Sequence, residues 1–236
     1  FSLIVASIYV VNQIVDIESD RINHKLFLLP HGFVHPVTAW VLAATCALGG
    51  MITSLYLGVE FTLLFAAGLV LGCLYNLPPV HLKNRPWGGV LANVAGHGIL
   101  TYLVGWYAAK TAVGRPALLA EGLRASLAPG FANAAVFLAT TIPDAGGDGA
   151  IGKRTFCVAF GEKKTALAAA VACAAAMGTT FMMQHHIWIM AAPTAISLVL
   201  FVYHAVVPRK DLAFQTFKWP VFLLSAVVAL MVPIYG

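Results

Sequence analysis

The chain has 236 residues, of which 60% are hydrophobic and 10% are charged, and its mean hydropathy is +0.86. Soluble domains carry roughly 25% charged residues, so this composition excludes an ordinary soluble globular domain and predicts a polytopic membrane protein. The net charge of +5 does not indicate nucleic-acid binding, because the basic residues are few and fall in loops.

Long apolar segments follow one another along the whole chain. A membrane-crossing helix needs about 20 mostly apolar residues and satisfies its own backbone hydrogen bonds, so each segment is predicted to be a transmembrane α-helix. The predicted spans cover residues 1–17, 36–57, 60–78, 88–108, 127–143, 165–183, 187–207 and 217–235. We therefore expect an all-α fold, a bundle of eight membrane helices in a single domain over residues 1–236.

The first predicted span is shorter than a membrane helix should be. Phe1 already lies inside the apolar run. The residues before Asn12 rise only about 17 Å as a helix, against a hydrocarbon core of about 30 Å. We therefore expect the chain to be truncated at its N-terminus, with an apolar groove beside residues 1–11.

The positive charges lie mainly on one side of the predicted bundle. The loops after the first, third, fifth and seventh spans hold most of the 14 Lys and Arg residues. The positive-inside rule assigns these loops to the cytoplasm, and we expect a multi-pass protein of a prokaryotic inner membrane. The residues are Arg21, Lys25, Lys83, Arg85, Lys153, Arg154, Lys163, Lys164, Arg209, Lys210 and Lys218.

The first of two acidic clusters directly follows the first apolar run, although the whole chain has only nine Asp and Glu residues. Asn12, Asp16 and Asp20 recur every four residues, which predicts that they share one drifting stripe of a helix. Glu18 lies about 200° around the helix from Asp16 and is therefore off that stripe.

The second cluster, in the stretch IPDAGGDGAIGKRTF, repeats this spacing with Asp144 and Asp148. Four spans separate Asp20 from Asp144, and an even number of spans returns the chain to the same face of the membrane. The loop YNLPPVHLKNRP, which contains Tyr75 and Lys83, follows two spans after the first cluster and reaches the same face. We therefore expect all these side chains at one cavity mouth on the cytoplasmic side.

Both acidic clusters are predicted at the C-terminal ends of helices, where the helix dipole disfavours negative charge. Like charges four residues apart also repel each other, so two such clusters indicate an external cation, although either one alone is open to interpretation as solvated loop residues. Mg²⁺ is often held by a few carboxylates together with substrate phosphates, and nearby basic residues suit phosphates. These residue types predict an anionic phosphate ester as the substrate, and a lipid diphosphate fits, with its head in the polar mouth and its tail between helices.

A weak internal repeat supports a two-part architecture. The spacing from Asp16 to Asp144 is 128 residues, and the spacing from Lys83 to Arg209 is 126. We therefore expect two related four-helix halves packed around a central cavity.

Taken together, N-x-x-x-D-x-x-x-D at 12–20, the loop from Tyr75 to Lys83, and D-x-x-x-D followed by GKRT at 152–155 resemble the UbiA family of intramembrane prenyltransferases. The resemblance covers residues 1–236. It implies a nine-helix fold, here without its first helix, and Mg²⁺-dependent transfer of a prenyl group from its diphosphate to a lipophilic or aromatic acceptor. It leaves the acceptor, the prenyl length and the pathway open.

The rival hypothesis is a membrane transporter that uses intramembrane carboxylates as a cation pathway. Transporters place such groups near the bilayer midplane, whereas these acids are predicted at helix ends on one face. We therefore favour the enzyme, with the lipid bilayer and a prenyl diphosphate as its partners and no nucleic acid.

The resemblance also implies roles for individual residues. Lys83, Arg85 and Lys153 would neutralise the leaving diphosphate, and an aromatic face at Tyr75 would stabilise the remaining allyl cation. The implied metal ligands are Asp16, Asp20, Asp144 and Asp148. The catalytic residues are Lys83, Lys153 and Tyr75, and the substrate-binding residues are Asn12, Arg21, Arg85, Asn93 and Arg154.

The sequence departs from the family pattern at two positions, and it contains several histidines that are not assigned to the site. Gly146 stands where many relatives carry an acid, and Asn23-His24-Lys25 stands where relatives often have N-K-P. His97, four residues after Asn93, is either functional or part of a packing hydrogen bond, and it is not assigned to the site. His185 and His186 are assigned to a loop at the opposite membrane interface.

Overall fold

The computed structural model describes residues 1–182 and 187–235, and within them every regular element is a helix. The all-α prediction is therefore confirmed for this part of the chain. The helices are α1 (Ser2–Val15), α2 (Ile17–Ile22), α3 (Pro36–Leu57), α4 (Val59–Asn76), η1 (Leu82–Asn84), α5 (Pro86–Asn93), η2 (Val94–Leu100), α6 (Thr101–Ala112), α7 (Leu119–Ala125), α8 (Leu127–Ala150), α9 (Phe156–Phe160), α10 (Glu162–Thr180), α11 (Ile187–Val206) and α12 (Lys210–Tyr235). His185 and His186 lie outside the described residues.

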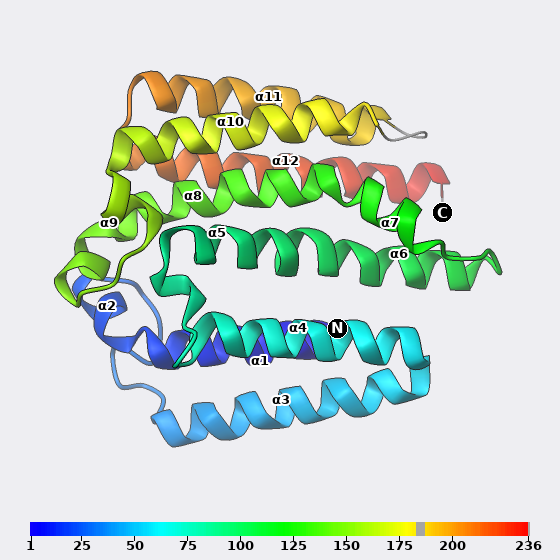
Figure 1. Cartoon of the computed structure of the whole chain (residues 1–236), viewed down its shortest axis with the longest axis horizontal. Helices are drawn as coiled ribbons and strands as arrows, with labels where there is room; N and C mark the ends of the chain where they lie inside the picture. The colour runs from blue at the N-terminus through cyan, green and yellow to red at the C-terminus, as the bar shows by residue number, and fades with distance from the viewer. Residues whose placement is uncertain (183–186, 236) are drawn as a thin grey trace.

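The long helices run side by side in one bundle, and the short helices α2 and α9 lie together at one end of it (Figure 1). Among the described residues, four stretches are long and apolar enough to cross a membrane: Pro36–Leu57, Val59–Asn76, Leu119–Ala150 and Ile187–Val206. The run from residue 86 to 112 is helical throughout, but the π-helix η2 divides it, so neither α5 nor α6 alone has the length of a span.

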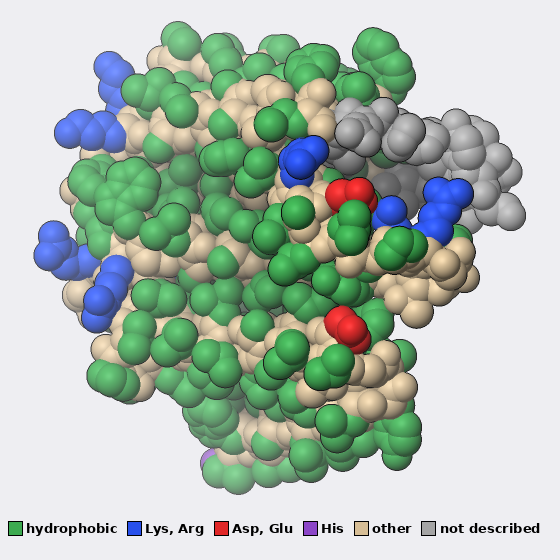
Figure 2. Space-filling model, turned by 45° about the vertical axis from the view of Figure 1, so that its right-hand side comes forward, with side chains coloured by type: hydrophobic (Ala, Val, Ile, Leu, Met, Phe, Trp, Pro, Cys, Tyr) green, Lys and Arg blue, Asp and Glu red, His purple; other side chains and the backbone are tan. Residues whose placement is uncertain are grey.

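Hydrophobic side chains cover most of the molecular face in Figure 2, and several Lys and Arg side chains lie along its left edge. Large apolar side chains on the long helices point outward, as Leu63 (65% exposed) and Val171 (63% exposed) do. Soluble proteins rarely expose apolar surface on this scale. The helices therefore have the composition and the outer surface of an integral membrane protein.

The interior is packed largely through small side chains. Ala134 and Ala139 of α8 and Ala169 of α10 are almost fully buried in one core cluster. Small residues let helix backbones approach closely, which is how helices associate in a lipid environment. A separate cluster joins α1 to α4 through Ile4 and Phe65.

The first acidic cluster does not lie on one uninterrupted helix, so the prediction of a single stripe is wrong in this detail. α1 ends at Val15, Asp16 has φ −99° and ψ 7°, and α2 begins at Ile17. The hydroxyl of Ser19 donates to the Asp16 carbonyl oxygen at 3.2 Å. Such side-chain bonds to the backbone compete with regular helix geometry. The break lets Asp20 reach the site from a second, short helix.

Candidate functional site

A polar cavity of about 270 Å³ lies where α1, α2, α4, η1 and α8 meet. All four aspartates predicted from the sequence contribute to its wall. Three lysines do so as well, which leaves one negative charge in excess when all seven groups are ionised. The acidic and basic residues are Asp16, Asp20, Lys25, Lys83, Asp144, Asp148 and Lys153.

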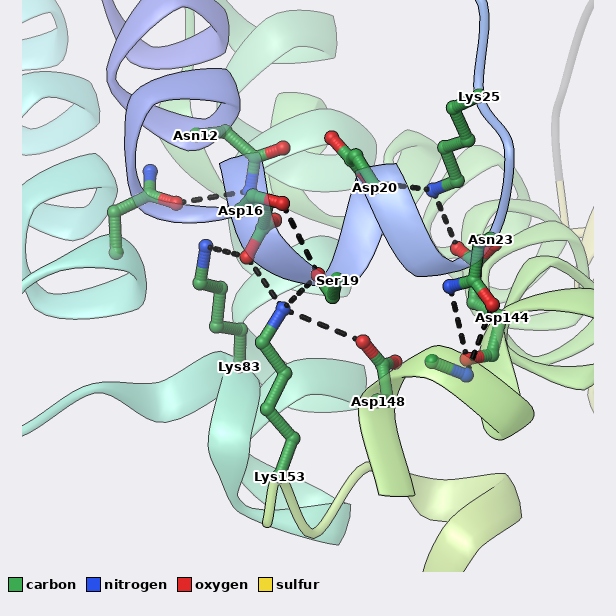
Figure 3. A network of polar contacts seen from close by, with 12 residues as sticks. Asn12, Asp16, Ser19, Asp20, Asn23, Lys25, Lys83, Asp144, Asp148 and Lys153 are labelled. Carbon is green, nitrogen blue, oxygen red and sulfur yellow. Dashed lines mark hydrogen bonds and ion pairs between the residues drawn. The ribbon is translucent and has the colours of Figure 1, made fainter. Parts of the chain in front are cut away.

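On one side of the cavity, Lys25 joins the two acidic clusters (Figure 3). Its Nζ lies 3.2 Å from Asp20 Oδ1 and 2.8 Å from Asp144 Oδ2. A positive charge thus lies between a carboxylate of α2 and one of α8. Asp20 is 4% exposed, whereas the side chains of Lys25 and Asp144 are 30% and 27% exposed, so only the Asp20 end of the bridge is shielded from solvent.

Lys153 makes the corresponding bridge on the other side (Figure 3). Its Nζ donates to Asp16 Oδ1 and to Ser19 Oγ, and it lies 3.3 Å from Asp148 Oδ1. The ammonium group of Lys83 also donates to Asp16 Oδ1, at 2.8 Å. Each bridge therefore contains one aspartate from each acidic cluster, with a cation between them.

The buried charges perturb one another. Burial opposes ionisation of Asp16, but Lys83 and Lys153 outweigh it and hold the pKa of that carboxyl below its usual value. Burial raises the pKa of Asp20, and Lys25 offsets only part of this effect. Burial also lowers the pKa of Lys83 despite its contact with Asp16. Perturbed groups that converge on a cavity are a mark of functional sites, although structural ion pairs produce them too.

Asn23 fixes α2 against α8. Its Nδ2 donates to the Asp144 carbonyl oxygen at 3.2 Å, and its Oδ1 accepts a hydrogen bond from the Gly147 amide at 2.9 Å. These bonds lie just after Pro143, where the sequence predicted the span to end but α8 continues to Ala150. A Cβ at Gly147 would come within 2.5 Å of the Asn23 side chain, so glycine makes room for this contact.

The cavity is lined by carboxylate oxygens, which are suitable ligands for a divalent cation. Its carboxylate oxygens are hard ligands, and Mg²⁺ needs only one or two protein carboxylates when substrate phosphates and water complete the coordination. Among the described residues, no group of three or more His, Cys, Asp or Glu side chains is arranged to hold a metal alone. The aspartates are instead paired, and in both pairs a lysine ammonium lies where a shared cation would lie.

An apolar pocket of about 140 Å³ adjoins the polar cavity between α1, α4 and the α5–η2 run. Asn12 and Tyr75 line both spaces and so form their boundary. Asn12 Nδ2 donates to Asn76 Oδ1 at 2.9 Å, which fixes its side chain there. A more open cavity continues along α1 and shares Phe1 and Val5 with the apolar pocket. A polar cavity and an apolar pocket thus lie side by side.

The structure does not bring every predicted residue into the cavity. Arg21, Arg85 and Arg154 are exposed and do not line it, and Arg21 donates instead to the Pro30 carbonyl oxygen at 3.2 Å. Asn93 lines the apolar pocket and donates to the Gly89 carbonyl oxygen at 3.0 Å. Their roles in substrate binding stay predictions, as do the roles of the aspartates as metal ligands.

Sequence reasoning missed three side chains of the site. Lys25 bridges the two clusters, Ser19 supports Lys153, and Asn23 joins α2 to α8. Asn23 and Lys25 stand where the family pattern often has N-K-P, and this was the signal that could have identified them. Ser19 had no comparable signal, because nothing in its neighbours indicates a contact 134 residues away.

Comparison with known proteins gives a consistent set of matches. A model of the UbiA prenyltransferase family matches residues 1–226. The apo structure of a UbiA homologue from Aeropyrum pernix K1 has a TM-score of 0.74 and 21% identity, covering 98% of this chain and 86% of that one. A UbiA homologue from Archaeoglobus fulgidus, bound to DMAPP and Mg²⁺, has a TM-score of 0.67 and 16% identity, covering 95% and 87%.

Two plant proteins are similar in sequence. A probable homogentisate phytyltransferase 2 of Oryza sativa subsp. japonica is 33% identical over 105 residues, which are 44% of this chain and 28% of that protein. A 2-acylphloroglucinol 4-prenyltransferase of Humulus lupulus is 29% identical over 168 residues, 66% of this chain and 39% of that protein. The chain thus spans well under half the length of these curated relatives.

Proposed function

Because the chain belongs to the UbiA prenyltransferase family, we propose that it transfers a prenyl group from its diphosphate to an acceptor inside the membrane. One observation carries the proposal. A cavity lined by four aspartates and three lysines adjoins an apolar pocket, with Asn12 and Tyr75 lining both. This is the shape and polarity that a molecule with a diphosphate head and a hydrocarbon tail requires.

In the proposed complex the diphosphate lies in the polar cavity. Four aspartates against three lysines leave the cavity slightly negative, so a diphosphate would be repelled without further positive charge. Asp16, Asp20, Asp144 and Asp148 are the proposed Mg²⁺ ligands, and the Mg²⁺ bound to the Archaeoglobus fulgidus homologue supports this. Mg²⁺, when bound, stabilises negative charge that develops on the leaving diphosphate.

The chain's own residues are proposed to act on both products of bond cleavage. The bond between the prenyl C1 and the diphosphate oxygen breaks, and its electron pair leaves with the diphosphate. Lys83 and Lys153 are positioned beside Asp16 to stabilise that developing charge. The aromatic face of Tyr75, at the boundary of the two spaces, stabilises the allyl cation, and the apolar wall excludes water from it.

The acceptor carbon then bonds to C1, and the acceptor loses a proton. An aromatic acceptor is supported by the names of the plant relatives, which act on homogentisate or 2-acylphloroglucinol. The exposed Arg21, Arg85 and Arg154 are proposed to attract the diphosphate from a distance rather than to bind it inside the cavity.

The membrane arrangement belongs to the same proposal. We propose that eight helical segments cross the bilayer as two related four-helix halves around the cavity, and that the acidic clusters face the cytoplasm. The Lys and Arg bias of the loops supports this orientation.

The test is Mg²⁺-dependent transfer by the reconstituted protein. Labelled geranylgeranyl diphosphate is incubated with homogentisate, a 2-acylphloroglucinol or 4-hydroxybenzoate, with Mg²⁺ or with EDTA. We expect prenylated product and released diphosphate only with Mg²⁺. Absence of product and of Mg²⁺-dependent prenyl diphosphate binding, together with cation flux across the liposome membrane, would support the transporter instead.

A further inference from the structure

His97 is a polar group in the apolar pocket that the proposed function does not use. It lines the pocket wall, and its ring centroid lies 5.6 Å from that of Tyr9. Within residues 1–182 and 187–235, neither ring nitrogen has a hydrogen-bond partner from the protein. The packing hydrogen bond with Asn93 that the sequence allowed is not present, because Asn93 donates to a backbone carbonyl instead.

The asparagine and threonine side chains of this pocket are satisfied by the protein itself. Asn12 and Asn76 bond to each other at 2.9 Å. Asn93 and Thr101 each donate to a backbone carbonyl of their own helical run, at 3.0 Å and 3.1 Å. The half-buried imidazole of His97 makes no hydrogen bond to the described part of the protein, so it can donate or accept one with a molecule that enters the pocket.

The backbone around His97 is shaped to direct it into the pocket. His97 lies in the π-helix η2, and π-helical segments inside α-helices are frequent at functional sites. Its neighbour Gly98 packs directly on α8, since a Cβ there would come within 2.5 Å of Gly130 Cα. With Gly98 fixed against α8, His97 is turned toward α1, where it meets Tyr9.

The position of His97 relative to the diphosphate site follows from α1. Tyr9 and Asn12 are three residues apart in α1, so they lie on one face, and Asp16 follows directly after the helix. The rise from Asp16 to Tyr9 is about 10 Å, and Tyr9 therefore lies about one turn beyond the boundary at Asn12. In the proposed complex, His97 therefore lies beside the space assigned to the prenyl C1 and its acceptor.

We propose that His97 binds the acceptor by accepting a hydrogen bond from a hydroxyl group on its aromatic ring, with the ring of Tyr9 as an adjoining flat wall. This rests on the proposed function and assigns the acceptor to the hydroxylated aromatics. A ligand without a hydroxyl group cannot form this hydrogen bond, so His97 gives the pocket a preference for hydroxylated ligands.

The experiment measures KM for both substrates in the reconstituted protein and in His97→Phe and His97→Gln. The acceptor used is whichever of homogentisate, a 2-acylphloroglucinol and 4-hydroxybenzoate is prenylated fastest. His97→Phe should raise the acceptor KM about three- to tenfold, the effect of one neutral hydrogen bond, and His97→Gln should restore part of it. The KM for geranylgeranyl diphosphate should stay within about twofold in both variants, since a contact with the acceptor alone leaves that KM unaffected.

A methylated acceptor supplies the complementary change. The methyl ether of the same acceptor should bind to the unmodified protein more weakly than the phenol does. His97→Phe should reduce the affinity for the methyl ether little further, because the methyl group and the substitution remove the same contact. Tyr102→Phe is the control, because Tyr102 stacks on Trp106 and is not part of the pocket wall.

Three results would overturn the inference while leaving the proposed function intact. His97→Phe could change the KM for the prenyl diphosphate instead, which would place His97 beside the tail. It could leave both KM values unchanged. The protein could bind prenyl diphosphate with Mg²⁺ yet prenylate none of the three hydroxylated acceptors. Loss of Mg²⁺-dependent prenyl diphosphate binding in the unmodified protein would instead contradict the proposed function itself.

Discussion

Gly147→Ala tests how the site is held together, because Gly147 is where α2 and α8 meet through Asn23. An added Cβ would come within 2.5 Å of the Asn23 side chain, so Asn23 has to move. Its movement breaks two hydrogen bonds, one to the Asp144 carbonyl and one from the Gly147 amide. The same movement shifts α2, which carries Asp20, relative to Asp144.

The magnitude follows from two opposing effects. A glycine-to-alanine change inside a helix stabilises by about 1 kcal/mol when there is space for it. Two lost hydrogen bonds cost about 1–3 kcal/mol together. Gly146→Ala is a matched control in the same turn, since nothing lies within 4 Å of a Cβ at Gly146. The two variants should therefore differ in free energy of unfolding by about 2 kcal/mol, because only Gly147→Ala loses the bonds.

Thermal unfolding in detergent micelles measures this difference. For a chain of this size, about 2 kcal/mol corresponds to a Tm difference of about 4–8 °C, with Gly147→Ala the less stable variant. Prenyl transfer should fall in Gly147→Ala and persist in Gly146→Ala. In an Asn23→Ala background, Gly147→Ala should cost little more, because its contact is already gone. Equal Tm and equal activity for the two glycine variants would refute the role given to Asn23.

Three further predictions concern the charged groups. Asp16→Asn should abolish prenyl transfer while preserving the fold. Glu18→Gln should retain most activity, because Glu18 is exposed and lies outside the cavity wall. If both variants lost activity equally, the assignment of Asp16 but not Glu18 to the cavity would be contradicted. Lys25→Met leaves Asp20 and Asp144 facing each other without their shared cation, so Mg²⁺ should raise its Tm more than that of the unmodified protein; an equal rise would show that Mg²⁺ does not bind between them. Chelation by EDTA should remove prenyl diphosphate binding and Mg²⁺ should restore it, as calorimetry in micelles would show, and binding that is unaffected by EDTA would exclude the metal from the diphosphate site.

The sequence predicted the site well, because the position of the site residues follows from their spacing and from the even number of spans between the two acidic clusters. Asp16 and Asp144 are 128 residues apart, yet both had to emerge on one membrane face, and the structure places both on one cavity. Apolar segment length likewise predicted helices over residues 36–57 and 187–207, where α3 and α11 lie. The membrane face of a loop and the extent of an apolar helix follow from the sequence pattern and the bilayer thickness alone.

The parts that sequence reasoning missed depend on contacts between distant residues. α8 continues beyond Pro143 where Asn23, from α2, bonds to its backbone, and no local pattern encodes that partner. The bridging role of Lys25 similarly requires that α2 approach α8. The π-helix around His97 contains Gly98, which closely contacts Gly130 of α8. In each case the local structure coincides with a contact between residues far apart in the sequence.

The central claim is that a diphosphate occupies the polar cavity while its prenyl tail passes Asn12 and Tyr75 into the apolar pocket. An experimental structure with Mg²⁺ and the non-hydrolysable analogue geranylgeranyl thiodiphosphate tests it most directly. We predict phosphate density between the two lysine-bridged aspartate pairs, Asp20 with Asp144 and Asp16 with Asp148, and tail density between α1 and α4. Phosphate density elsewhere, or a tail on the side of α11 and α12, would contradict the account.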